Sequence, residues 1–140
     1  NVKIINNTVN DFNNLKIGGL EFFKDINWVK EFKPSDYKKE MEIAIKQTIQ
    51  AKKYLTKFRE IDFLICHQPP YGYLDKVTAK FAPLHWQGKN AGSKTILNFI
   101  KKNQPKYVFC GHIHEGVGEA NIGKTKVYNL GVAGYKIIEL

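Results

Sequence analysis

The sequence predicts an α/β fold in a single domain over residues 1–140, because short apolar runs alternate with segments of helical periodicity. Hydrophobic residues make up 43% of the chain, which is enough to build a buried core. The sequence contains no internal repeat and no low-complexity tract that would divide it.

Two short strands are expected near the N-terminus. Residues 1–6 and 16–23 carry enough apolar side chains to pair, and the turn-forming residues 11–14 between them favour a hairpin. The Gly18-Gly19 pair predicts a bend or bulge within the second strand.

A long amphipathic helix is expected to begin at Pro34-Ser35-Asp36. Ser35 can cap its first turn, and Asp36 suits the positive N-terminal end of a helix. The residues that recur on one face are Tyr37, Met41, Ala44, Thr48, Ala51, Leu55 and Phe58. This pattern predicts a face that packs on the core rather than on a partner.

The middle of the chain predicts a strand, a long loop and a second helix. The apolar run at residues 61–66 indicates a buried strand that ends at His67. A loop rich in aromatic residues, Gly and Pro follows over residues 71–92, and loops of this length are often functional. Ser93 is the expected cap of a helix over residues 93–103.

The C-terminal part is expected to consist of strands. Residues 106–110 indicate a buried strand that leads into Gly-His-Ile-His at 111–114. Residues 118–122, 126–129 and 134–140 predict three more strands, separated by glycine-containing turns.

The charge of the chain favours a lysine-rich surface over a nucleic-acid interface. The net charge of +9 comes from 22 Lys and Arg against 13 Asp and Glu, and Arg59 is the only arginine. Arginine is the preferred residue for bidentate contacts to bases and phosphates, so a nucleic-acid partner is not favoured. No apolar run reaches the roughly 18 residues of a membrane span, and we expect no membrane partner.

Cys66 and Cys110 lie in the predicted buried strands, beside the histidine segments. A small secreted chain that depends on disulfides would carry more cysteines. We expect both to act as small apolar side chains, with metal ligation as the alternative. The sequence also lacks a basic and apolar leader at its start, so a reducing, cytoplasmic location is expected.

Three of the four histidines follow predicted core strands. Because the carboxyl ends of neighbouring strands form ligand sites in α/β sheets, His67, His112 and His114 predict a metal site. An extended backbone would point His112 and His114 to one side, and Gly111 would let the chain adopt unusual backbone angles. Neutral imidazole suits Zn, Mn, Fe, Co and Ni. The alternative is a set of surface histidines at strand ends.

The segments around these histidines resemble the last two motifs of the calcineurin-like metallophosphoesterases. These segments are Ile-Cys-His-Gln-Pro-Pro-Tyr-Gly at 65–72 and Cys-Gly-His-Ile-His-Glu-Gly at 110–116. Residues 90–93 and 129–131 are similar to family members as well. The resemblance implies the C-terminal half of a four-layer α-β-β-α sandwich with mixed β-sheets. This chain would supply one sheet, part of the other and two helices.

The resemblance also implies two divalent metal ions (Mn, Fe, Zn, Co or Ni) that hold a phosphoester substrate and activate water for in-line attack. His67 and His112 would bind one ion and His114 the other. The earlier family motifs, Asp-x-His, Gly-Asp-x-x-Asp and Gly-Asn-His, are absent, and with them the family's catalytic histidine. Three imidazoles without a carboxylate would hold one metal poorly. We therefore expect a missing N-terminal half, from the same protein or from a second chain, to complete the site.

Four other polar residues near these motifs are candidates to support a histidine or to touch substrate. They are Asp75, His85, Asn90 and Glu115. For Asp75 and Glu115 the alternative is a solvated loop carboxylate. For His85 a loop position packed on Trp86 is favoured.

These patterns lead to one main hypothesis and two alternatives. The main hypothesis is a metal-dependent phosphatase or phosphodiesterase whose two-metal site needs further residues. The first alternative is a non-catalytic, degenerate phosphoesterase module used for binding or assembly, because the metal-binding aspartates are absent. The second is a basic nucleic-acid-binding domain, which only the net charge favours.

Overall fold

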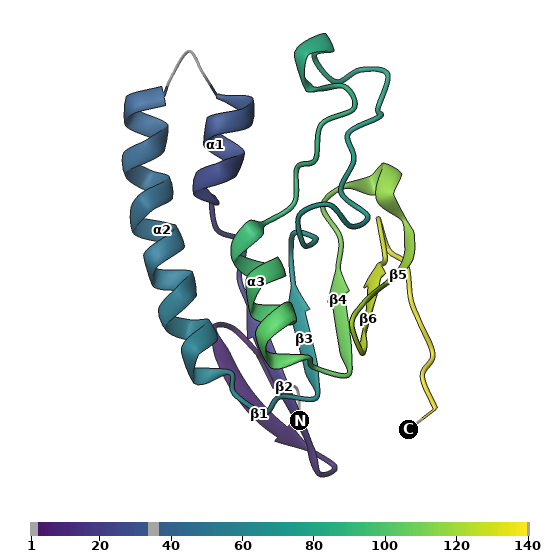
Figure 1. Cartoon of the computed structure of the whole chain (residues 1–140). Coiled ribbons are helices and arrows are strands. Elements are labelled where there is room, and N and C mark those ends of the chain that lie inside the picture. The colour runs from purple at the N-terminus through teal and green to yellow at the C-terminus, as the bar shows by residue number, and fades with distance from the viewer. Residues whose placement is uncertain (1–2, 34–36, 140) are drawn as a thin grey trace.

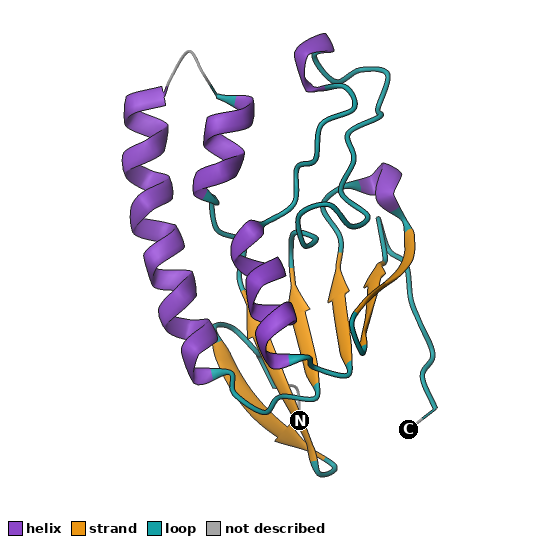
Figure 2. Cartoon of the chain, viewed as in Figure 1, coloured by secondary structure: helices purple, strands orange, loops and turns teal. Residues whose placement is uncertain are grey.

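The computed structural model describes residues 3–33 and 37–139, which form one mixed β-sheet with helices packed against it (Figures 1 and 2). The strands are β1 (Thr8–Phe12), β2 (Leu15–Leu20), β3 (Phe63–Cys66), β4 (Tyr107–Cys110), β5 (Gly118–Ile122) and β6 (Thr125–Asn129). The helices are α1 (Ile26–Phe32), α2 (Tyr37–Lys57) and α3 (Lys94–Asn103), with short 3-10 turns at Leu84–Trp86 and His114–Gly116.

The strands lie in the order β1-β2-β3-β4-β6-β5. Strands β2, β3, β4 and β6 are parallel, whereas β1 and β5 pair antiparallel at the two edges. The carboxyl ends of the four parallel strands therefore meet at one edge of the sheet, where α/β folds usually place ligand sites. The predicted α/β class is confirmed.

The helices cover one face of this sheet and build the main core. Leu64, Val108 and Val127 lie next to one another on β3, β4 and β6 and are fully buried at 0% exposure. Ile96 and Ile100 of α3 belong to the same cluster, as do Ala51 and Leu55 of α2. Strand side chains alternate between the two faces, so every second residue of β3 and β4 points toward these helices.

The opposite face of the sheet carries aromatic and aliphatic side chains that no helix of residues 3–33 and 37–139 covers. Phe63 packs edge-on against Tyr107 and Phe109, and Phe109 stacks on Tyr128. Ile65, in the middle of the sheet, is 45% exposed. A second sheet packs on an apolar face of this kind in sandwich folds. The described residues contain no strand of a second sheet, so the expectation that this chain supplies part of one was wrong for them.

The N-terminal hairpin exists, but its first strand was predicted in the wrong place. Residues 3–6 form no strand, and β1 instead comprises Thr8–Phe12, the last two residues of which had been assigned to a turn. Asn13 and Asn14 connect β1 to β2 with φ values of 47° and 62°. Two successive positive φ angles are typical of the tight two-residue hairpin turn that asparagine favours.

The Gly18-Gly19 pair forms no bulge. Both residues pair in register with β1 on one side and β3 on the other. A Cβ at Gly18 would lie 3.0 Å from the side chains of Phe58 and Ile61, and a Cβ at Gly19 would overlap the backbone of Ile5. These glycines are therefore explained by close packing on both faces of a regular strand.

The long helix is confirmed as α2, with Ala44, Thr48, Ala51 and Leu55 buried on the predicted face. Tyr37 is 44% exposed, so the first residue of that face does not reach the core. The expected cap at Pro34–Asp36 lies outside the described residues. Helix α1 was not predicted; it is short, and its cap is the Asp25 carboxylate, which accepts a hydrogen bond from Asn27 N.

The C-terminal strands were predicted correctly up to Asn129. Residues 134–139, which had been expected to form a final strand, have no regular structure. Helix α3 begins after Ser93, whose hydroxyl accepts from Ile96 N at 3.1 Å, as expected for its cap. In the described part of the chain, no helix combines the length and the apolar character needed to cross a membrane.

Cys66 and Cys110 are free, buried thiols. Burial raises the pKa of Cys66 well above its usual value and that of Cys110 to about 12. Each thiol donates to a backbone carbonyl, such as Tyr128 O for Cys110. Both cysteines are therefore inert small side chains in the helix-covered core, consistent with the expectation from the sequence.

Candidate metal centre

The carboxyl ends of β3 and β4 bring His67 and His112 together. His67 Nε2 and His112 Nδ1 lie 3.0 Å apart, and Gly111 N donates to His67 O at 2.9 Å. This backbone hydrogen bond continues the β3–β4 pairing beyond the two strands and holds the two loops in register. Both histidines are exposed residues at the sheet edge, although the ring of His112 is partly desolvated.

The backbone is strained at His112, not at Gly111. His112 has φ = 66°, and Ile113 N donates to Gly111 O at 2.8 Å across it. This three-residue γ-turn with a positive φ is a rare, strained conformation for a residue with a side chain. The predicted extended backbone through His112 and His114 was therefore wrong, as was the special role of Gly111. Strain of this kind is frequent at functional sites.

The spacing of the two ring nitrogens fits one metal ion. Imidazole nitrogens bind divalent metals at about 2.0–2.1 Å, and a separation of 3.0 Å then corresponds to an angle of about 90° at the metal. That angle is the one between neighbouring ligands of an octahedral ion. Among residues 3–33 and 37–139, however, no three His, Cys, Asp or Glu side chains come close enough to hold a metal. The donor set is compatible with a metal but incomplete.

The pKa of His112 is lower than usual for a histidine. Desolvation of the ring is the main cause, and the electrostatic effects of His67 and His114 add to it. The neutral form of His112 is therefore favoured, and neutral imidazole is the form that binds metals.

His114 begins the 3-10 turn at His114–Gly116 and is exposed. Among the described residues, no hydrogen bond or ring contact joins it to His67 or His112. Of the three predicted ligands, the fold thus brings two into direct contact, and the third lies two residues beyond His112 in the chain.

Asn129, at the end of β6, joins the loops that carry the histidines. Its side chain is 1% exposed and donates from Nδ2 to Ile113 O at 2.8 Å and to Leu74 O at 3.0 Å. The first carbonyl lies between His112 and His114, and the second lies in the loop after His67. From the sequence, residues 129–131 were identified only as part of the family resemblance. A polar residue at the end of a parallel core strand was the signal for this role.

Phe22 is a second residue that the sequence analysis missed. Its ring packs on His67 and His112, with centroid distances of 5.4 Å and 5.7 Å. Phe22 follows β2, the parallel neighbour of β3, so the rule that placed His67 at the sheet edge also applied to Phe22.

Asp75 supports the loop after His67 and does not contact the histidines. Its carboxylate is 2% exposed and accepts from Gly72 N and Gly92 N, each at 2.9 Å. Burial raises the pKa of Asp75, although the backbone N–H groups of Gly72 and Gly92 act in the opposite direction. Asp75 therefore joins the two ends of the long loop between β3 and α3.

Replacing Asp75 by alanine should destabilise the fold by about 2–4 kcal/mol, because two amides at the loop ends lose their acceptor. Asp75→Asn keeps one oxygen for both amides and should cost less.

The raised pKa of Asp75 means that the folded state keeps the carboxyl proton at pH values where the unfolded chain has lost it. Wild-type stability should therefore fall, relative to that of Asp75→Asn, as the pH rises above about 4. Urea unfolding from pH 4 to 7 measures both effects, and parallel pH profiles would contradict this account.

The remaining candidate residues belong to or contact a projecting arm, defined as residues 76–90. This arm extends beyond the sheet edge (Figure 1). Glu115 accepts from Thr78 N at 3.2 Å and from Ala79 N at 2.7 Å. Partial burial acts to raise the pKa of Glu115, but backbone N–H donors, including these two, outweigh it, and the pKa is lowered. Asn90 pairs with Lys76 at the base of the arm.

His85 lies in the 3-10 turn of this arm, edge-on to Trp86 at 5.9 Å, and is exposed. The favoured interpretation of His85 as a loop residue packed on Trp86 agrees with this geometry. Asp75, His85, Asn90 and Glu115 thus shape the loop around the histidine pair without touching it.

Comparison with known proteins identifies the family of the chain. The family model for calcineurin-like phosphoesterases matches residues 2–116, which include both histidine loops. The chain belongs to the calcineurin-like phosphoesterase family. Membership supports phosphoester hydrolysis in general, and the family generally uses divalent metal ions.

Two relatives and one solved structure of the same fold illustrate the extent of the similarity. Metallophosphoesterase domain-containing protein 1 of Homo sapiens is 37% identical over 73 residues, covering 51% of this chain and 20% of that protein. UPF0046 protein T07D4.2 of Caenorhabditis elegans is 37% identical over 70 residues, covering 49% of this chain and 16% of that protein. One crystal structure shares the fold with a TM-score of 0.60 at 18% identity, covering 92% of this chain and 46% of that one. The chain thus spans about half of the solved structure and a fifth or less of the curated relatives.

Proposed function

We propose that this chain supplies the histidine side of a two-metal site that hydrolyses phosphoesters. The observation that carries the proposal is the His67–His112 pair, held 3.0 Å apart at the carboxyl edge of the sheet with a strained backbone at His112. His67 and His112 would hold one divalent ion, and His114 would contribute to the second. The ions would supply charge neutralisation for the phosphate and activation of water.

The remaining ligands must come from outside the described residues. Two neutral imidazoles in contact cannot template two divalent ions, and carboxylates supply the missing charge in most such sites. The uncovered apolar face of the sheet offers a place for the polypeptide that carries these carboxylates. We propose that a further segment of the same protein, or a second chain, packs there and completes the site.

The residues of this chain would hold the reacting groups in place. Gly111 N and Asn129 fix the separation of the two loops, and the γ-turn at His112 aims its ring at His67. In the reaction, the oxygen of a water molecule forms a bond to phosphorus while the bond to the ester oxygen breaks. Water supplies the proton that the leaving oxygen gains and the hydroxyl that remains on phosphate. Holding water and ester in line accounts for a large part of such a rate enhancement.

The test is hydrolysis of p-nitrophenyl phosphate and bis-p-nitrophenyl phosphate by the product of the complete reading frame, loaded with Mn²⁺. His67→Ala should lower kcat/KM by more than about a hundredfold, because even groups that merely orient metal ligands are worth about 10–100-fold. His85→Ala is the matched control, since it removes an exposed imidazole from the arm and should leave the rate within about twofold. Equal rates for both variants and wild type would reject the proposal.

A further inference from the structure

A small cavity adjoins the histidine pair. It has a volume of about 200 Å³ and is bordered by His112 on one side. Its walls are largely aromatic or apolar, with Phe22, Phe23, Trp28 and Ala91 contributing side chains. A cavity of about 150 Å³ with an apolar lining accepts a benzene ring, so this one has room for a single aromatic ring.

One polar group in this cavity lacks a partner. Gln68 is 4% exposed and donates from Nε2 to Phe23 O at 2.8 Å. Its Oε1 accepts no hydrogen bond from any described residue, although it is buried. A buried acceptor without a donor is costly, and native structures seldom retain one without a role. Oε1 is closed to a water-sized probe, so an N–H or O–H group of a ligand would donate to it only after the Gln68 side chain rotates toward the cavity.

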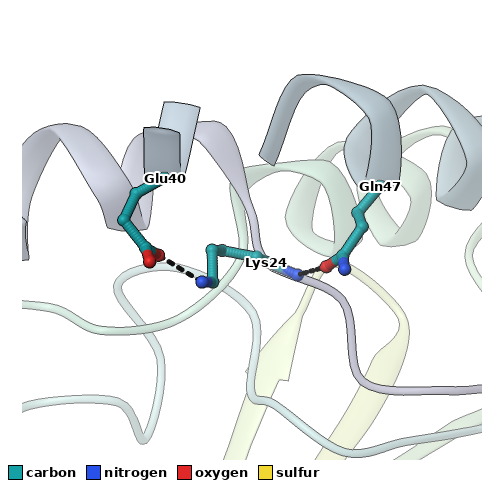
Figure 3. Close-up of polar contacts among 3 residues, drawn as sticks. All are labelled: Lys24, Glu40 and Gln47. Carbon is teal, nitrogen blue, oxygen red and sulfur yellow. Dashed lines mark hydrogen bonds and ion pairs between the residues drawn. The ribbon is translucent and has the colours of Figure 1, made fainter. Parts of the chain in front are cut away.

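The backbone of one wall, Phe22–Asp25, is anchored before any ligand arrives. Lys24 N donates to Gln47 Oε1 at 2.7 Å, and its ammonium pairs with Glu40, so both ends of Lys24 are tied to α2 (Figure 3). The neighbouring Asp25 carboxylate accepts from Ser93 Oγ at 2.5 Å. The segment Phe22–Asp25 is therefore anchored to both α2 and the start of α3. A preformed pocket of this kind loses little entropy on binding.

From these observations we infer that the cavity is the leaving-group pocket of the site. It would take a flat aromatic or heteroaromatic ring that carries a hydrogen-bond donor for Gln68 Oε1. Phe22 connects the histidine pair to the cavity, because its ring contacts both histidines and also lines the cavity. The inference rests on the proposed function for its use in hydrolysis, and it assigns the substrate class as aryl or heteroaryl phosphoesters.

The pocket can be tested without metal or hydrolysis by titrating the metal-free product of the complete reading frame with phenol, which has the ring and the donor but no phosphate. Phenol should shift the NMR signals of the Gln68 side-chain amide and the Trp28 indole. Phe22→Ser should weaken phenol binding by about 3- to 10-fold, the range expected for one aromatic contact. Phe81→Ser is the matched control, because Phe81 is 93% exposed and lies outside the cavity. If the Gln68 and Trp28 signals did not shift, or if both variants weakened phenol binding equally, phenol would not bind in this cavity and the inference would be rejected.

The role of the cavity in hydrolysis is tested with phenyl phosphate and methyl phosphate. Both are offered as substrates to the metal-loaded product of the complete reading frame. The KM for phenyl phosphate should be lower than that for methyl phosphate, and Phe22→Ser should reduce this ratio toward one. Hydrolysis of both esters with equal KM would reject the leaving-group pocket while leaving the proposed function intact. Hydrolysis of neither ester, together with phenol binding at the pocket, would reject the proposed function instead.

Discussion

Replacing His112 by glycine should abolish metal binding and at the same time stabilise the metal-free chain relative to His112→Ala. Both variants remove one member of the imidazole pair, so neither should bind Mn²⁺ or Zn²⁺ detectably at this edge. Glycine, however, accepts the φ of 66° that His112 adopts, whereas alanine keeps the strain. The difference in unfolding free energy should be about 1 kcal/mol in favour of His112→Gly, after allowing for the greater freedom of glycine in the unfolded chain.

Urea unfolding of the two variants, with isothermal titration of each metal, measures both parts of this prediction. The control is the same pair of substitutions at Lys101, an exposed position in α3, where glycine should be less stable than alanine by about 1 kcal/mol. If His112→Gly were also the less stable variant, the backbone at this position would not be strained. The conformation would then give no support to a functional site.

Replacing Gly116 by alanine should destabilise the chain by about 3 kcal/mol, near the upper end for an overpacked site. A Cβ at Gly116 would overlap the carbonyl oxygen of Leu74, which is backbone and cannot rotate away, and would lie 3.1 Å from Asn129 Nδ2. The substitution therefore pushes apart the two loops that Asn129 joins. The spacing of the histidines depends on those loops, so metal affinity should fall as well.

Gly111→Ala is the matched control, since it lies before the same histidine segment. A Cβ there would lie 3.5 Å from Gly131 O, an ordinary contact, and should cost less than about 1 kcal/mol. The measurement is the urea midpoint of each variant, compared when the unfolding free energy of both depends equally on urea concentration. Similar costs at both positions would show that the Leu74–Asn129 contact does not hold the loops together.

The parts of the fold that the sequence predicted well are those in which a strong local pattern agrees with the tertiary structure. The apolar runs ending at Cys66 and Cys110 became β3 and β4, and Ser93 capped α3 as its position suggested. The placement of His67 and His112 at one sheet edge followed from parallel strand pairing. In each case a continuous apolar run or a cap residue marked the element.

The parts that were missed depend on pairing or packing that a local pattern does not contain. Strand β1 has a polar sequence and exists because its backbone pairs with β2 at the sheet edge. Helix α1 has seven residues, too few for a clear periodicity, and is held by the Asp25 cap and the contact of Phe32 with Trp86. Short elements of this kind are stabilised mainly by tertiary contacts.

The details of the site could not be derived from spacing either. The His-x-His pattern suggested an extended segment, but the γ-turn at His112 depends on Asn129 and on the pairing of Gly111 with His67. Sequence reasoning assigns positive φ to glycine by default, and the neighbouring Gly111 therefore received the role that His112 has. Phe22 and Gln68 are brought to the site by the tertiary fold, and no local sequence pattern indicated them.

We propose that this chain provides the histidine side of a two-metal site that further polypeptide completes. Native mass spectrometry of the product of the complete reading frame, after exposure to Mn²⁺ and paired with an intact mass under denaturing conditions, tests it most directly. We expect a species that contains this chain with further polypeptide and two divalent ions, and loss of at least the ion that His67 and His112 would hold in the His67→Ala, His112→Ala double variant. A metal-free species, or full metal occupancy in the double variant, would contradict it.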